Sequence, residues 1–169
     1  FTNLSQDHLD FHGDMESYWE VKQRLFTRHL KEGGSPGRAV INVNDPRGRA
    51  LAGRLNPLPI TVGTDGDVTV RAVLSRSGLS GMAGTITTPD GPFSFQTALI
   101  GGHNLENILC AVGAAMAAGL SPEAIRSGIE AAGAVPGRLE RVPDPDGRFV
   151  FVDYAHTPHA LENVLAALR

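Results

Sequence analysis

Short β-branched runs that alternate with helix-forming segments constrain the fold of this chain more than any other feature of its sequence. Residues 39–43 form one such run, which ends at Asn44-Asp45-Pro46, a turn or helix start. Residues 46–55 favour a short helix, and residues 59–62 favour a second strand. Strands and helices that alternate in this way pack as layers, so the sequence predicts an α/β fold.

The pattern changes near Asp65, where strand-like segments follow one another without helices between them. These segments span residues 67–74, 79–88 and 92–100, and Thr88-Pro89-Asp90-Gly91-Pro92 is a strong turn signal between the last two. We therefore predict a small antiparallel sheet of about three strands in this region.

Two helices are predicted next, from about Asn104 to Ala118 and from Ser121-Pro122 to about Gly133, the second with Ser as N-cap and Pro at its first position. Val135-Pro136-Gly137 is typical of a linker. Beyond it the sequence predicts two strands and a helix, at residues 139–142, 149–152 and from about 158.

The composition is that of a globular protein, with 41% hydrophobic and 20% charged residues. A net charge of -3 argues against a nucleic-acid partner. The longest apolar stretch, residues 108–120, is too short for membrane insertion. Cys110 is the only cysteine and is interpreted as a small buried hydrophobe rather than a nucleophile; a lone cysteine fits a reducing cytoplasm.

Residues 14–32 predict a helix with Asp14 as N-cap and Gly33-Gly34 as its stop. Lys22 lies at the centre of its apolar stripe, where an ammonium loses hydration unless it is paired or neutralised. Three outcomes stay open: Lys22 extends to the rim, pairs with a buried carboxylate, or becomes a neutral amine that forms a metal-binding carbamate. The stripe consists of Met15, Tyr18, Trp19, Leu25 and Phe26.

Three further segments carry candidate site residues. Residues 7–12 hold two His and two Asp, which are potential metal ligands or surface and capping groups. Residues 101–107 form a glycine-led helix entry suited to phosphate or base binding, with helix capping by Asn104 as the competing explanation. Residues 149–158 predict a buried strand that stops on a polar cluster with Asp153 and His156. Ligands bind at such strand ends in α/β proteins, with turn chemistry as the competing explanation for these two residues.

Together these segments resemble the Mur ligase family, and the resemblance covers essentially the whole chain. The last motif and the residues after it resemble most closely the branch that adds the third amino acid, meso-diaminopimelate or L-lysine, to the peptidoglycan stem peptide. The matching motifs, in family order, are residues 1–16 with Tyr18 and Lys22, Asn42-Val43-Asn44-Asp45-Pro46, Gly102-His103-Asn104 with Asn107, Pro136-Gly137-Arg138-Leu139-Glu140 and Asp153-Tyr154-Ala155-His156-Thr157-Pro158.

The resemblance implies an ATP- and Mg²⁺-dependent amide ligase, monomeric and cytoplasmic. Its substrates would be UDP-MurNAc-L-Ala-D-Glu and a diamino acid, joined through an acyl-phosphate. Lys22 would be a carbamylated catalytic residue that shares Mg²⁺ with His8. His156 is a second catalytic candidate.

The resemblance also implies a nucleotide site. Asn104 would contact adenine with Asn107 beside it, Arg138 would contact the phosphates and Asp153 the ribose. The chain contains no G-x-x-x-x-G-K-[ST] phosphate loop, so the cradle would have to come from elsewhere.

The implied architecture is an incomplete, Rossmann-like three-layer central ATPase domain over residues 1–136, without its phosphate loop, followed by the start of the C-terminal α/β ligase domain over 137–169. We expect the 169 residues to be a fragment that turns over no ATP alone. Two alternatives remain: a related cyanophycin or folylpolyglutamate synthetase, and a non-catalytic nucleotide-binding module.

Overall fold

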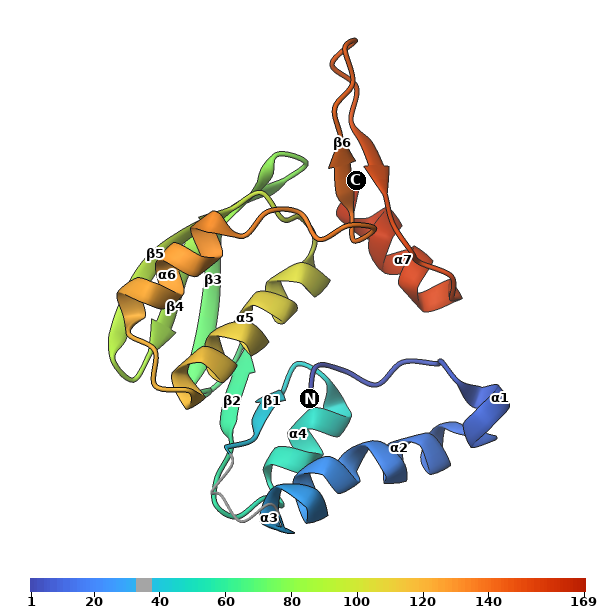
Figure 1. Cartoon of the computed structure of the whole chain (residues 1–169), viewed down its shortest axis with the longest axis vertical. Helices are drawn as coiled ribbons and strands as arrows, with labels where there is room; N and C mark the ends of the chain where they lie inside the picture. Colours follow the sequence, from blue (N-terminus) through green and yellow to red (C-terminus); the bar gives the residue numbers. More distant parts are fainter. Residues whose placement is uncertain (33–37) are drawn as a thin grey trace.

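A computed structural model describes residues 1–32 and 38–169 and places helices on both sides of a mixed β-sheet (Figure 1). The strands are β1 Val40–Asn42, β2 Ile60–Gly63, β3 Val70–Gly78, β4 Gly81–Thr88, β5 Gly91–Thr97, β6 Glu140–Val142 and β7 Val150–Val152. The helices are α1 Leu9–His12, α2 Met15–Arg24, the π-helical η1 Leu25–His29, α3 Leu30–Glu32, α4 Pro46–Ala52, α5 Gly102–Ala117, α6 Pro122–Ala131 and α7 Pro158–Ala167.

The main sheet has the strand order β1-β2-β3-β4-β5 and changes from parallel to antiparallel pairing along its width. β1 pairs with β2 and β2 with β3 in parallel, whereas β3, β4 and β5 pair antiparallel. The three predicted antiparallel strands and the Thr88–Gly91 turn are therefore confirmed. They continue the parallel layer, because Val62 of β2 aligns with Val70 of β3.

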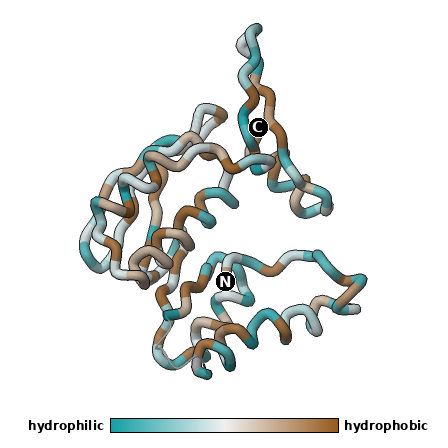
Figure 2. Tube along the Cα trace, in the orientation of Figure 1, coloured by the Kyte–Doolittle hydropathy of each residue, from teal (hydrophilic) through white to brown (hydrophobic). Residues whose placement is uncertain are grey.

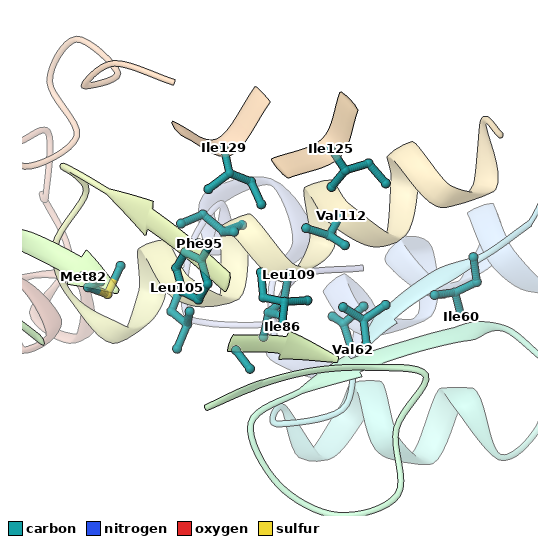
Figure 3. Close-up of a cluster of buried hydrophobic side chains, with 13 residues drawn as sticks. Ile60, Val62, Met82, Ile86, Phe95, Leu105, Leu109, Val112, Ile125 and Ile129 are labelled. Carbon is teal, nitrogen blue, oxygen red and sulfur yellow. The ribbon is translucent and has the colours of Figure 1, made fainter. Parts of the chain in front are cut away.

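Two hydrophobic clusters pack on opposite faces of the parallel strands. Adjacent strand residues point to opposite faces, so Val40 packs against the cluster beneath α5 and α6, while Ile41 belongs to the cluster that contains Trp19 and Leu51. Figure 3 shows the first cluster, in which side chains of the sheet meet those of the two helices. Its labelled members are Ile60, Val62, Met82, Ile86, Phe95, Leu105, Leu109, Val112, Ile125 and Ile129.

The antiparallel half of the sheet has one buried and one exposed face among the described residues. In β4, Met82 and Ile86 are fully buried, while Thr85 and Thr87 between and beyond them are exposed. This alternation is the pattern expected of an antiparallel sheet covered on one side. The β6–β7 hairpin projects away from the main sheet (Figure 1) and carries hydrophobic residues along its strands (Figure 2). Val142, Val150 and Val152 are exposed and Phe151 is partly buried, so the expectation of a buried strand here is wrong.

The predicted helix caps agree with the structure. The backbone N–H of Ser17 donates to Asp14 Oδ1 over 2.7 Å at the start of α2, and that of Ala124 donates to Ser121 Oγ over 3.3 Å at the start of α6. Both bonds satisfy N–H groups that a helix leaves without intrahelical acceptors. The predicted stop at Gly33-Gly34 lies outside the described residues.

The predicted apolar stripe is wrong at Leu25, whose side chain is 55% exposed. The buried line runs through Trp19 and Phe26, which are seven residues apart and therefore nearly superimposed on a helix. Leu25 precedes Phe26 by one residue, a rotation of about 100°, and this places it on the solvent side.

Cys110 packs against the hydrophobic cluster under α5, as expected for a small hydrophobe. Burial raises the pKa of its thiol to about 11, so the thiolate is scarce at neutral pH. Among the described residues, none of the helices combines the length and the hydrophobicity needed to cross a bilayer.

We predict opposite stability changes for one substitution at two helical glycines. A Cβ added at Gly113 of α5 would lie 2.6 Å from Val40 Cγ1, whereas one added at Gly128 of α6 would meet no atom within 4 Å. Gly113→Ala should lower the free energy of unfolding by about 1–3 kcal/mol through overpacking. Gly128→Ala should raise it by up to about 1 kcal/mol through helix propensity. Urea denaturation of the intact protein measures both; equal effects would contradict the close packing of α5 on β1.

Candidate functional site

A polar cavity of about 800 Å³ lies where the carboxyl end of β1, the first turns of α5 and the two ends of the chain come together. Five of the predicted site residues line it: Asn104, Asn107, Arg138, Asp153 and His156. The other residues that line it are residues 3–7, Asn44-Asp45, Gly102-His103, Glu106, Tyr154-Ala155, Thr157, His159-Ala160 and Asn163-Val164.

The first turn of α5 forms the floor of the cavity. Its free N–H groups and the positive end of its dipole favour a negatively charged ligand. Asn104 is 5% exposed, and its Nδ2 donates to the Ile100 carbonyl over 2.9 Å, so this side chain ties α5 to the preceding loop. Asn107 is exposed and its Nδ2 lies 3.5 Å from Asn104 Oδ1. Of the two amides, Asn107 is the one free to contact a ligand.

Asp153 organises the backbone around Arg138. Its Oδ2 accepts from the Leu139 N–H over 2.8 Å and its Oδ1 from the Ala155 N–H over 2.7 Å, and the Tyr154 N–H donates to the Gly137 carbonyl over 2.8 Å. Leu139 has a positive φ of 46°, an uncommon conformation for a non-glycine residue. Asp153 thus holds the strained segment that presents Arg138 to the cavity.

A long contact between Asp7 and His156, which is an ion pair only when the histidine is protonated, connects the N-terminal segment with the segment that follows β7. His156 Nε2 lies 3.9 Å from Asp7 Oδ1, and His156 Nδ1 lies 3.1 Å from the Tyr154 carbonyl oxygen. Both side chains are partly exposed, so the pair contributes little to stability. Its position nevertheless puts Asp7 and His156 on facing walls of one site.

Asn44 connects three elements beneath the cavity, a role that the sequence did not suggest. Its Nδ2 donates to Glu106 Oε1 over 3.0 Å, and its Oδ1 accepts from the Thr64 N–H over 3.1 Å. The carboxyl end of β1 is thereby joined to the end of β2 and to α5. The strand-end rule that selected Asp153 also applies to Asn44 and would have found it.

The structure places His8 and Lys22 outside the cavity lining, around the ring of Tyr18. Lys22 Nζ donates to the Asn3 carbonyl over 3.0 Å and lies 5.1 Å from the Tyr18 ring centroid. The His8 ring centroid lies 6.3 Å from that of Tyr18. Of the three outcomes considered for Lys22, this geometry corresponds to extension toward the rim, with cation–π contacts.

These two residues do not by themselves form a metal site. An ammonium group offers no lone pair, and the His8 side chain is 66% exposed. Over the residues that the structure covers, no group of three or more His, Cys, Asp or Glu side chains is arranged to hold a metal ion. Any divalent cation here would need water or ligand oxygens to complete its coordination.

The fold and the cavity define the class of this protein. Residues 1–115 match the Mur ligase middle domain, and this match covers more than half of the chain. The chain belongs to the Mur ligase family.

Comparison with individual proteins shows which members of the family the chain is similar to. The chain is 52% identical, over 98% of its length, to the UDP-N-acetylmuramoyl-L-alanyl-D-glutamate--2,6-diaminopimelate ligase of Geobacter metallireducens, of which it covers 33%. A solved ligase of the same name superposes with a TM-score of 0.76 at 32% identity, covering 98% of this chain and 34% of that one. MurF from Acinetobacter baumannii superposes with a TM-score of 0.83 at 20% identity, over 98% and 36%, which shows the fold alone. The chain spans about a third of the length of the curated relatives it matches.

We predict that His103 stays neutral below the pH at which an ordinary histidine is protonated. Burial lowers its pKa from 6.5, and the Arg138 charge acts in the same direction, against Asp153 and Glu106. The unfolded chain then binds more protons than the folded one just below pH 6.5. This contribution to stability is present above pH 6.5 and is lost as the pH falls from there through the lowered pKa of the folded state. NMR titration of the histidine ring protons measures this, and a His103 pKa at or above 6.5 would contradict the burial of the ring.

Proposed function

We propose that this chain is the nucleotide-binding part of a ligase that adds meso-diaminopimelate to UDP-MurNAc-L-Ala-D-Glu in peptidoglycan synthesis. The observation that carries the proposal is the cavity, which gathers Asn107, Arg138 and Asp153 around the start of α5 in a chain 52% identical to a ligase of that name. Mur ligases depend on ATP, and these groups suit its polar parts.

In this proposal, different residues of the cavity contact the phosphates, the ribose and the base of ATP. The N–H groups at the start of α5 and the Arg138 guanidinium offset phosphate charge. Asp153 keeps Arg138 in place and retains carboxylate lone pairs that can accept from ribose hydroxyls. Asn107 offers an amide that can donate to and accept from a base edge, while Asn104 holds the helix start beneath it.

The proposed reaction joins two substrates through an activated acid. The D-Glu carboxylate attacks the γ-phosphorus of ATP and forms an acyl-phosphate, with ADP as leaving group. The amine of the diamino acid then attacks the acyl carbon, and phosphate and a proton are released as the amide forms. Positive groups aimed at the transferring phosphoryl group supply most of the rate enhancement in such reactions.

We also propose that Lys22 acts as a carbamate. A neutral Lys22 amine adds carbon dioxide and releases one proton, which replaces a cation with an anionic oxygen ligand. Together with the His8 imidazole this gives two donors beside the ring of Tyr18, and water and phosphate oxygens suit the remaining positions. Mg²⁺ bound there would neutralise charge on the phosphoryl oxygens.

The chain divides, in this proposal, into a central ATP-binding domain over residues 1–136 and the start of a C-terminal ligase domain over 137–169. The match to the Mur ligase middle domain over residues 1–115 supports the first part. The β6–β7 hairpin and α7 support the second, because Val152, Leu161 and Leu165 expose apolar surface that a larger domain would bury. The whole protein is proposed to act as a cytoplasmic monomer.

The intact protein should release phosphate from ATP only when UDP-MurNAc-L-Ala-D-Glu and meso-diaminopimelate are both present with Mg²⁺. Arg138→Ala should raise the KM for ATP at least tenfold by removing a phosphate contact. Arg76→Ala, an exposed arginine on β3, is the control and should leave the KM unchanged. Mass spectrometry of the tripeptide product identifies the amino acid added; no product with any diamino acid would rule out the proposed reaction.

Lys22→Arg should reduce kcat at least 100-fold, because arginine keeps the positive charge but forms no carbamate. Lys31→Arg, the same change at the other lysine of the chain, is the matched control. Carbon-13 NMR of intact protein supplied with labelled bicarbonate should show a carbamate signal that Lys22→Arg removes. Full activity of Lys22→Arg would exclude the carbamate.

A further inference from the structure

The segment of residues 3–7 forms a complete wall of the cavity although it has no regular secondary structure. It leads directly into His8, so its position fixes where Asp7 and His8 lie relative to the ligand. A segment without its own helix or strand bonds needs anchors from neighbouring elements. Three side chains supply such anchors: Asn42, Lys22 and Asp45.

Two of these anchors bind backbone carbonyls near the start of the segment. Asn42, which is 1% exposed, donates from Nδ2 to the Thr2 carbonyl over 2.8 Å. Lys22 Nζ donates to the Asn3 carbonyl over 3.0 Å. Asp45 acts at the next position along the chain, where its Oδ2 accepts from the Leu4 N–H over 2.9 Å. Of the three, it holds the point nearest to Asp7.

Asp45 performs a second task with its other oxygen. Its Oδ1 accepts from the N–H groups of Arg47 over 2.7 Å and Gly48 over 3.1 Å, which caps α4. One carboxylate thus fixes the start of α4 and the wall of the cavity at once. Three backbone donors already engage its two oxygens. Although Asp45 lines the cavity, its charge is committed to the backbone and not to a ligand.

We propose that Asp45 is a positioning residue that sets nucleotide affinity by holding residues 3–8 against the cavity. The proposal rests on the function proposed above. Asp45 itself touches no substrate in this scheme; it acts through the Leu4 N–H on Asp7 and His8. Loss of this bond frees the wall, so that a bound nucleotide must pay the ordering entropy of the segment.

Asp45→Asn separates the two tasks of the side chain. Asparagine is an N-cap as good as aspartate, so its carbonyl oxygen keeps the bonds to Arg47 and Gly48. Its NH₂ group then faces the Leu4 N–H, donor against donor, and the wall anchor is lost. Asp45→Ser gives a second version of the same test, because serine also caps a helix but its shorter side chain cannot bridge to Leu4.

Hydrogen exchange and ADP binding by the intact protein test the proposal. Both variants should raise the amide exchange rate of residues 4–8 at least fivefold, and should raise the Kd for Mg²⁺-ADP in calorimetry about three- to tenfold. Asp14→Asn is the matched control: it makes the same change at the N-cap of α2, where the carboxylate accepts from the Ser17 N–H within its own helix start. It should change neither quantity.

The outcomes separate this proposal from the function on which it rests. Unchanged exchange of residues 4–8 in both Asp45 variants would overturn the anchor, and faster exchange with an unchanged Kd would overturn its effect on affinity. No ADP binding by the wild-type protein would instead overturn the proposed nucleotide site. Equal effects in Asp14→Asn would show that capping alone, and not the Leu4 bond, is responsible.

Discussion

Close packing of α5 on the two parallel strands determines where every other part of the site lies. Gly113 lets the helix approach so near to β1 that a single added carbon would overlap Val40. The same helix contributes Leu109 and Val112 to the core. Its N-terminal end carries Asn104 and the first N–H groups to the carboxyl edge of the sheet. The position of the cavity is therefore a consequence of core packing, to which Asn104 and Glu106 add hydrogen bonds at the binding end of the helix.

Much of the fold could be predicted from local sequence patterns, because these parts of the structure depend on short-range interactions. The Asp14 and Ser121 caps, the Thr88–Gly91 turn and the order of strands and helices all depend on short-range chemistry. The pairing of β2 with β3, which connects the parallel and antiparallel halves of the sheet, could not be predicted in this way. It depends on pairing of Val62 with Val70 across an intervening turn, and sequence periodicity does not specify which strand becomes a neighbour.

The site was predictable where residues follow a strand or begin a helix, and harder to predict where a side chain acts on the backbone. Asp153 and Asn107 were found and line the cavity. Asn104 was assigned to a ligand, yet its amide is buried and donates to the Ile100 carbonyl. The N-cap of α5 is Gly101, so the capping explanation that the sequence left open is wrong as well. Lys22 was identified by its place among apolar residues. Its contact with Tyr18 follows from helical spacing, because the two residues are four apart in α2. Its bond to the Asn3 carbonyl was not predictable, because Asn3 lies in a segment with no periodic pattern.

The carboxylates around the cavity raise an electrostatic question, since unpaired negative charges would repel the phosphates of a nucleotide. Asp45 accepts from three backbone N–H groups, Asp153 from two, and Glu106 from the Asn44 amide. These hydrogen bonds engage part of each carboxylate with donors of the protein itself. Arg138 and the start of α5 line the same cavity and supply positive charge there. The acidic residues build the walls, and the attraction for an anion comes from groups that the walls hold in place.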